Sequence, residues 1–287
     1  MKASIDLIGC YWTLAGRYEF GEHDESPFDF RDRVEAAARA GYRGIGLKIA
    51  DLRRVRAQYG YAGMRRLLAD HDLPHVEVEA LFDWFATGDA RRQSDRDRRD
   101  LLEAAVELGA HHMKCCGDFN LPGCPFAQLH HEFQSLAAEA RACGVTLALE
   151  FLPVSNVNSL RKTLDVLGES AGRGAGVMLD IWHVTRTRTP FEDIAALPAA
   201  YIACAELDDG TINVVVSELE DTLNERRLPG EGEFDVPGFI RAVLATGYSG
   251  PFGVEIISAE QRARPLEEAA RRSFEAANAQ VRAALMT

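Results

Sequence analysis

Apolar residues follow two different periods along this chain, and segments of the two kinds alternate from one end to the other. Short runs that are apolar throughout or alternate with polar residues predict eight strands, at residues 4–10, 42–49, 75–81, 112–116, 145–150, 176–180, 201–206 and 252–257. Apolar residues three and four apart predict helices at residues 28–40, 51–71, 91–108, 126–143, 159–169, 191–196, 236–246 and 266–286. We expect a break near Gly60 and a long loop over residues 208–233.

This alternation of strands and helices favours an α/β protein built as a single (β/α)8 TIM barrel. A doubly wound open sheet is the competing architecture, and it usually has a glycine-rich phosphate turn between its first strand and the next helix. The glycines Gly41, Gly44 and Gly46 instead precede and enter a strand, so a dinucleotide site is disfavoured. Because no Gly/Ser-rich or Pro-rich linker divides the chain, residues 1–287 are predicted to form one domain.

The last four predicted strands each carry a carboxylate near their carboxyl end: Glu150, Asp180, Glu206 and Glu255. The side chains that share the parity of these acids are mostly small, whereas those of opposite parity are bulky and apolar. Because successive strand residues point to opposite faces, the acids are expected to face away from the helices and into one space. Four confined carboxylates need a cation, which predicts a site for Mg²⁺ or Mn²⁺. The alternative is that each acid caps a helix or forms an ion pair.

Two candidates for substrate contacts lie close to these acids in the sequence. His183 follows Asp180 by three residues, and it is either a packed histidine or a group beside the metal that contacts substrate. The stretch 226–234 (RRLPGEGEF) combines glycines, which allow a close approach of the backbone, with arginines such as Arg227. An arginine there is suited to grip a substrate oxygen, and the alternative is a simple turn before the next helix.

Three charged residues on the early strands also have the inward parity: Lys48, Glu79 and Lys114. Substrate contact, proton transfer and buried ion pairs within the barrel are all open for them. The run of alternating charges over residues 91–100, by contrast, is typical of a solvated helix face.

Composition narrows the set of partners and compartments. The formal net charge of −12 disfavours nucleic acid as the main partner, because phosphate binding requires a basic face. No apolar run is long enough to cross a membrane, and residues 1–10 are too short and too polar for a secretory signal, so a cytoplasmic protein is expected. The six cysteines contain no CxxC pair, which favours reduced thiols.

Taken together, these motifs resemble the sugar phosphate isomerase/epimerase superfamily, the xylose-isomerase-like TIM barrels. The resemblance extends along nearly the whole chain. It depends on the order and spacing of five stretches, at residues 149–153 (LEFLP), 179–183 (LDIWH), 205–210 (AELDDG), 228–234 (LPGEGEF) and 247–258 (GYSGPFGVEIIS).

The resemblance implies one divalent metal ion, Mn²⁺ or Mg²⁺, held by the four strand-end acids. It also implies that His183 and an arginine such as Arg227 contact substrate oxygens. Position 206 departs from the family pattern, because a glutamate stands where histidine or glutamine is more common. An all-carboxylate set favours a harder ion, unless Glu206 lies behind the ligands or the chemistry itself has changed. Barrels of this kind often pair, so a homodimer is also implied.

The activity that the resemblance implies is proton abstraction next to the carbonyl of a small keto sugar or cyclic keto polyol. In an isomerase or epimerase, Glu150 and Glu255 resemble an acid/base pair on opposite faces of the substrate. In a dehydratase of the inosose or 3-dehydroshikimate type they are only ligands, and His183 or Lys48 handles the proton. A DNA-repair endonuclease of the same barrel type is disfavoured by the acidic charge, and a non-catalytic sugar-binding barrel is the alternative of another class.

Overall fold

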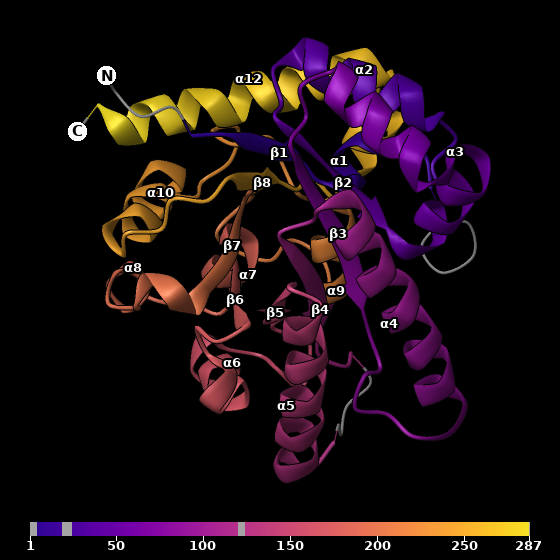
Figure 1. Cartoon of the computed structure of the whole chain (residues 1–287). Coiled ribbons are helices and arrows are strands. Elements are labelled where there is room, and N and C mark those ends of the chain that lie inside the picture. The colour runs from indigo at the N-terminus through magenta and orange to yellow at the C-terminus, as the bar shows by residue number, and fades with distance from the viewer. Residues whose placement is uncertain (1–4, 19–24, 120–123, 287) are drawn as a thin grey trace.

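Eight parallel strands form a closed barrel in the computed structural model, which describes residues 5–18, 25–119 and 124–286 (Figure 1). Each strand pairs with its neighbour in the sequence, and β1 pairs with β8 to close the ring. The strands are β1 (Leu7–Gly9), β2 (Gly44–Lys48), β3 (His75–Leu81), β4 (His112–Cys116), β5 (Thr146–Glu150), β6 (Ala175–Asp180), β7 (Ile202–Leu207) and β8 (Phe252–Val254). The predicted (β/α)8 TIM barrel is therefore confirmed.

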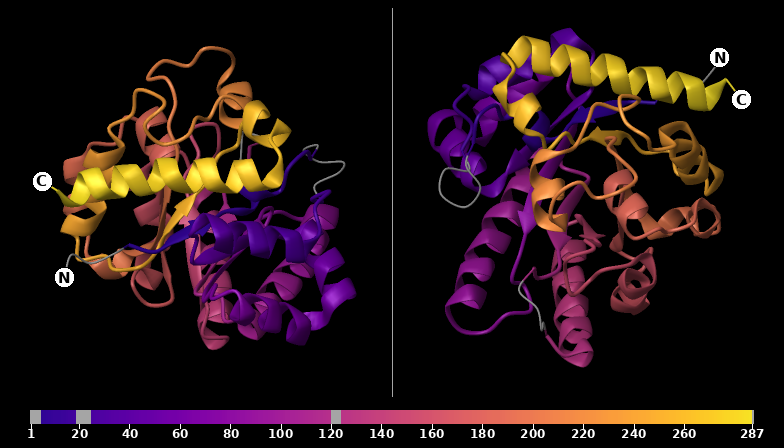
Figure 2. Two further views of the ribbon diagram at one scale, coloured as in Figure 1. Left: turned by 90° about the horizontal axis from the view of Figure 1, so that it is seen from above. Right: turned by 180° about the vertical axis from the view of Figure 1, so that it is seen from behind.

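Helices surround the barrel and connect each strand to the next (Figure 1). They are α1 (Tyr11–Leu14), α2 (Phe30–Ala40), α3 (Ile49–Asp70), α4 (Gly88–Leu108), α5 (Phe126–Ala142), α6 (Leu160–Leu167), α7 (Ile181–Arg186), α8 (Phe191–Ala195), α9 (Glu218–Asn224), α10 (Val236–Ala245), α11 (Ala259–Ala263) and α12 (Leu266–Leu285), with short 3₁₀ turns at Gly168–Ser170 and Ala199–Tyr201. The last helix, α12, lies along the outside beside α2 and α10 (Figure 2). Among the described residues, no helix combines the length and the apolar character needed to cross a membrane.

The predicted elements end within three residues of the observed ones, and the last strand, predicted to extend to residue 257, ends at Val254. The short helices α1, α7 and α11 were not predicted. The first strand begins at Leu7, and Ser4, where it was predicted to start, lies outside the described residues. Helix α3 has the expected break, because Gly60 adopts a φ of 60° and a ψ of 160°. The long loop expected over residues 208–233 is present, but it contains a helix that was not predicted, α9, which begins at a cap by the Ser217 side chain.

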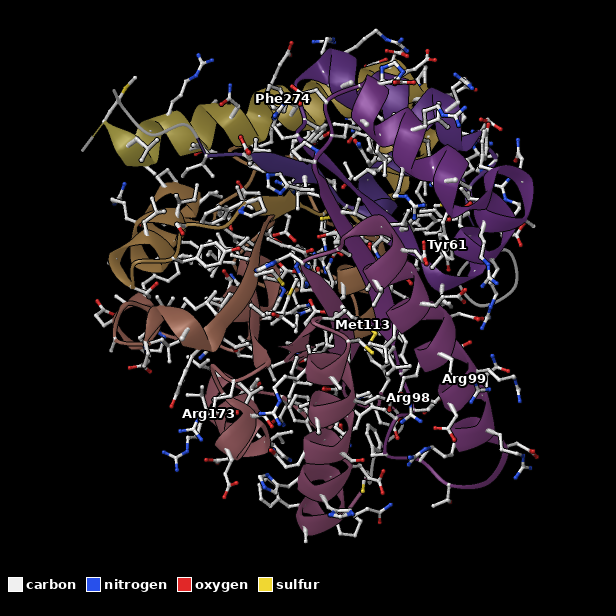
Figure 3. All side chains as sticks on the ribbon, viewed as in Figure 1. Tyr61, Arg98, Arg99, Met113, Arg173 and Phe274 are labelled. Carbon is white, nitrogen blue, oxygen red and sulfur yellow. The ribbon has the colours of Figure 1, made fainter. Side chains whose placement is uncertain are left out.

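The two faces of the barrel strands carry different side chains, as their parity predicts. Outward residues such as Met113 (Figure 3) and Leu147 are fully buried under the helices. Burial of each such aliphatic side chain contributes about 1.5–3 kcal/mol. Most inward positions instead carry small or polar groups, and a separate small cluster contains Met178 with Ala148, Ala203 and Cys204. The fold is thus held by the layer between strands and helices, which leaves the interior free for polar groups.

The alternating charges of α4 lie on its outer face and on its borders with neighbouring helices. Arg99, labelled in Figure 3, is exposed, and Arg98 pairs with Glu139 of α5 at 3.3 Å. Arg53 of α3 pairs with Asp97 at 2.7 Å. These contacts account for the charge run as a solvated face that also joins adjacent helices.

Candidate active site

The four acids predicted as metal ligands come together at the carboxyl ends of the last four strands. Glu150 ends β5, Asp180 ends β6, Glu206 lies one residue before the end of β7, and Glu255 follows β8 directly. All four are buried, and each offers a carboxylate oxygen within 4.8 Å of the others. Space for Glu206 comes from Gly253 on the adjacent strand, where an added Cβ would lie 2.6 Å from Cγ of Glu206. Strand parity and register therefore suffice to assemble this carboxylate cluster.

His183 reaches the cluster from the first turn of α7, immediately after β6. Its Nε2 lies 3.5 Å from Oε1 of Glu150 and 3.6 Å from Oδ2 of Asp180. The other oxygen of Asp180 accepts a hydrogen bond of 2.8 Å from the backbone N–H of Trp182, so this acid caps α7 and fixes the histidine beside it. Burial lowers the pKa of His183 to about 3, although the charge of Asp180 opposes the shift. The imidazole is therefore neutral at pH 7.

Arg226 is the arginine that the structure brings into the cluster. Its Nη1 donates to Asp180 at 2.7 Å and to Asp208 at 2.6 Å, and it lies 3.1 Å from Oε2 of Glu255. Burial opposes the charge, but the surrounding carboxylates, Asp180 first, raise the pKa of Arg226 well above its usual value. A permanent cation thus lies among the acids.

Arg227, which was predicted to contact substrate, is placed differently. Its backbone forms an antiparallel bridge with Asp209, with N···O distances of 2.8 and 3.1 Å, and its side chain is exposed. Within the part of the chain that the structure describes, no ion pair joins Arg227 to the cluster. Because neighbours alternate across such a bridge, Arg226 points inward together with the buried Leu228. That shared parity with an apolar residue is the sequence signal that identifies Arg226.

A second cation, Lys114 of β4, lies below the cluster and is 1% exposed. Its Nζ is 3.4 Å from Glu77, 3.1 Å from Glu79 and 3.5 Å from Glu255, and it also forms a short contact with Glu206. The expectation of buried ion pairs on the early strands is confirmed for Lys114 and Glu79. The sequence did not indicate that the same ammonium would extend across the barrel to the last two strands.

Lys48 ends β2 at the same rim of the barrel, and it is 8% exposed. Its Nζ lies 4.9 Å from the centre of the Trp12 ring, and its register partner on β3 is Glu79. Lys48 is therefore a buried cation at the rim of the barrel, on the strand next to Glu79.

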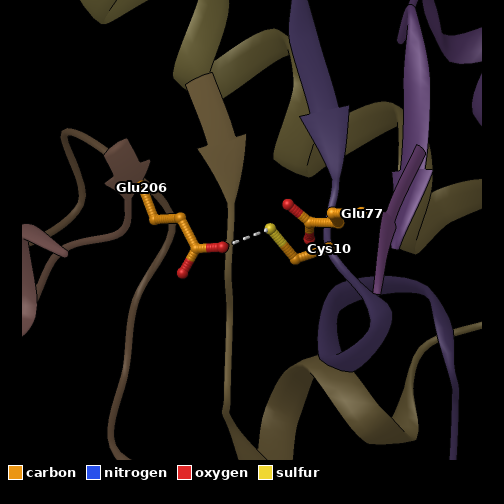
Figure 4. A group of neighbouring side chains, drawn as sticks. All are labelled: Cys10, Glu77 and Glu206. Carbon is orange, nitrogen blue, oxygen red and sulfur yellow. Dashed lines mark hydrogen bonds between the residues drawn. The ribbon is translucent and has the colours of Figure 1, made fainter. Parts of the chain in front are cut away.

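Two thiols also contact the carboxylates. Cys10 Sγ donates to Oε1 of Glu206 at 3.2 Å, and Glu77 lies on the other side of this thiol (Figure 4). Cys116 Sγ donates to Oε2 of Glu150 at 3.2 Å. Burial raises the pKa of both thiols well above the usual value, so each serves as a neutral donor to a carboxylate.

Mutual repulsion is the main electrostatic property of the cluster. Burial, followed by the charges of Glu255 and Asp180, raises the pKa of Glu150 to about 8. Burial and the neighbouring carboxylates also raise the pKa values of Glu206 and Glu255. The pKa of Asp180 is lowered despite its burial, because Arg226 and His183 face it.

The residues present fit a divalent metal ion. Oε1 of Glu150 and Oε2 of Glu206 are buried and accept no hydrogen bond from the described residues. The donor set combines carboxylate oxygens with the neutral nitrogen of His183, and both donor types suit borderline divalent ions. An ion among these oxygens would also relieve the repulsion that raises their pKa values.

Comparison with known proteins shows which barrel proteins the sequence resembles. The profile of the xylose isomerase-like TIM barrel family matches residues 34–279. The chain is 26% identical over 244 residues to a 3-dehydroshikimate dehydratase of Pseudomonas putida, a match that covers 83% of this chain and 37% of that protein. It is 29% identical over 137 residues to an inosose isomerase of Halalkalibacterium halodurans, covering 47% of each. The chain thus spans less than half the length of these curated relatives.

A solved structure supports the fold. The crystal structure of the IOLI protein with a bound zinc atom superposes with a TM-score of 0.80 at 17% identity, over 96% of this chain and 98% of that one. At this identity the likeness shows the shared barrel alone.

Proposed function

The chain belongs to the xylose isomerase-like TIM barrel family, and from that membership and its carboxylate cluster we propose that it is a divalent-metal-dependent enzyme. It removes a proton next to the carbonyl of a cyclic keto polyol and then eliminates water, as a lyase of the 3-dehydroshikimate or inosose type. The observation that carries the proposal is the set of four buried carboxylates within 4.8 Å of one another, with a neutral histidine beside them. The match over 83% of the chain to a dehydratase favours water loss over isomerisation.

The metal would be held by Glu150, Asp180 and Glu255, with Glu206 as the fourth group. When bound, a divalent ion acts as a Lewis acid that polarises a carbonyl and makes the neighbouring C–H more acidic. The protein contributes the orientation of this set: Asp180 is fixed by the N–H of Trp182 and by Arg226, and Glu150 by the thiol of Cys116. Held in this way, the acids need little reorganisation during reaction.

Proton transfer is assigned to groups at the mouth of the cluster. Neutral His183 can accept a hydrogen bond from a substrate hydroxyl at a ring nitrogen, because burial lowers its pKa to about 3 and keeps the imidazole uncharged. Lys48, at the end of β2, takes up the proton from the carbon next to the carbonyl as the amine and returns it, as the ammonium, to the departing hydroxyl, so that water leaves and the lysine is regenerated. Arg226 is committed to Asp180 and Asp208, so its role is to position these acids.

Isomerisation is the second candidate, and the relationship to inosose isomerases favours it. Both reactions begin with the same proton abstraction, and they differ in whether a neighbouring hydroxyl leaves. In the isomerase, Glu150 and Glu255 act as the acid/base pair on opposite faces of the substrate. The two candidates are therefore distinguished by the product rather than by the first step.

The test is incubation of Mn²⁺-loaded protein in D₂O with 3-dehydroshikimate, an inosose and a ketohexose, followed by mass spectrometry. Deuterium at a carbon next to the carbonyl supports proton abstraction, and product lighter by one water identifies the dehydratase. Product of unchanged mass apart from deuterium identifies the isomerase. If every candidate binds but keeps its protium, the non-catalytic sugar-binding barrel replaces the proposal.

A further inference from the structure

Lys114 makes contacts across the barrel that an ordinary ion pair between neighbouring strands would not make. It stands on β4, yet its ammonium contacts Glu77 and Glu79 of β3, Glu206 of β7 and Glu255 after β8. The side chain of Lys114 is 1% exposed, so these carboxylates replace the water that an ammonium would otherwise bind. Glu206 and Glu255 also belong to the four-carboxylate cluster, which places this cation directly beneath it.

The two oxygens of Glu206 have different surroundings. Oε1 accepts hydrogen bonds from Lys114 and from the thiol of Cys10, the latter at 3.2 Å (Figure 4). Oε2 is buried and accepts no hydrogen bond from the residues that the structure describes. One oxygen is thus fixed from below by donors, and the other is free to bind an ion.

The pairing also changes the charge that an ion in the cluster would meet. Glu150, Asp180, Glu206 and Glu255 carry four negative charges when ionised, and the ammonium that Glu206 shares with Glu255, Glu77 and Glu79 offsets part of this charge. On the opposite side Arg226 provides a similar compensation for Asp180 and Asp208. Groups behind a metal ligand that fix its orientation and charge commonly change metal affinity about 10–100-fold when they are removed.

We propose that Lys114 is a positioning residue of the metal site, which holds Oε1 of Glu206 so that Oε2 faces the ion and which offsets part of the negative charge of this ligand. The inference rests on the proposed function only in requiring that the carboxylate cluster bind a divalent ion. It also explains how a glutamate is tolerated as the fourth group of an already acidic site.

The test compares Mn²⁺ binding by isothermal titration calorimetry in Glu206→Gln, Lys114→Met and the double variant, all without substrate. Glu206→Gln is expected to bind Mn²⁺ about 10–100-fold more weakly, because it loses an anionic ligand and leaves the Lys114 charge facing the ion. The double variant restores the charge balance, so it is expected to bind at least about tenfold more tightly than Glu206→Gln alone. Lys162→Met, on the outer helix α6, is the matched control and keeps wild-type affinity.

The visible absorption of bound Co²⁺ supplies a readout that a purely structural role would not change. In Lys114→Met the spectrum is expected to differ from wild type, since Glu206 is no longer held through one oxygen, whereas Lys162→Met gives the wild-type spectrum. A double variant that binds no more tightly than Glu206→Gln overturns the inference, and so does a Glu206→Gln protein with wild-type affinity. If the variants that lack Lys114 do not fold, the affinity of Glu206→Gln for Mn²⁺ still decides, because wild-type affinity in that protein overturns the inference.

Failure of the proposed function gives a different result. A protein that shows this coupling between Lys114 and Glu206 but converts none of the candidate substrates leaves the inference standing and overturns the enzymatic proposal. A wild-type protein that binds no divalent ion overturns both.

Discussion

The interior of the barrel has two halves that use charge in opposite ways. On the β5–β8 side, Glu150 and Glu255 lie close to other acids, and their pKa values are raised by burial and repulsion. On the β1–β4 side, Glu77 is paired with Lys114 and His112, which lower its pKa to about 2 even though burial opposes this. Equal burial therefore does not give equal electrostatics: cations offset burial at Glu77, whereas burial raises the pKa of Glu79 beside it to about 7. The acids on the β5–β8 side remain the group available to a ligand.

The largest expected effect is the loss of the cation that compensates the acidic half. Arg226→Met leaves Asp180 and Asp208 buried without their partner, which is expected to lower the free energy of unfolding by about 3–5 kcal/mol. The neighbouring Arg227→Met is the control, and it should change stability by less than about 0.5 kcal/mol because its side chain is exposed. Urea denaturation of the metal-free proteins measures both. Equal effects of the two substitutions would contradict the placement of Arg226.

The second-largest expected effect is on metal binding, which should differ between substitutions in the two halves of the barrel interior. Glu150→Gln is expected to lose stoichiometric Mn²⁺ and to lower kcat/KM by roughly 100-fold or more, since one metal-mediated interaction contributes several kcal/mol. Glu79→Gln, a matched substitution on β3, should retain the metal because Glu79 pairs with Lys114. Metal analysis after gel filtration checks both variants. Loss of metal in Glu79→Gln would remove the distinction between the halves.

The third effect concerns pH in the metal-free protein. The folded-state pKa of Glu150 is raised to about 8, above its unfolded value, so the folded state binds more protons and becomes less stable as pH rises from about 4.5 to 8. Glu150→Gln removes this group and should flatten that part of the stability profile. The measurement is thermal unfolding of both proteins across this range without metal, and a wild-type profile no steeper than that of the variant would contradict the prediction.

The smallest expected effect comes from the thiol donors. Cys116→Ala removes the hydrogen bond to Oε2 of Glu150 and should cost about 1 kcal/mol of stability, whereas Cys143→Ala at an exposed position should cost nothing measurable. Chemical denaturation is again the measurement. A neutral Cys116→Ala would mean that this thiol does not restrain Glu150.

The sequence predicted much of this arrangement because strand parity is a local property. Alternating small and bulky residues place Glu150, Asp180 and Glu206 on the inward face whatever the helices do. The short helix α9 was missed, because it is held by contacts distant in sequence, such as the salt bridge of 2.6 Å between Arg186 and Asp221.

The dependence on contacts distant in sequence also explains why the positions of the cations Arg226 and Lys114 were not predicted. The parity that Arg226 shares with Leu228 distinguishes it from Arg227 only when this segment is extended, and the segment is extended because it forms an antiparallel bridge to Asp209. The reach of Lys114 depends on the closed ring, because only closure brings β4 within contact of the residues on β7 and after β8. The sequence shows which residue types are present, but it does not show which distant segments pair with one another.

The pairing of β1 with β8 has a consequence for the order of folding. Leu7 is the register partner of Phe252, and Thr13 accepts and donates hydrogen bonds with the backbone around Val254 and Ile256. Contacts between such distant segments form late, because the chain must first close a very long loop. The pairing of β1 with β8 is therefore expected to form late in folding, and Glu255 follows directly after β8. The four-carboxylate cluster and the closed barrel are therefore completed by the same segment of the chain.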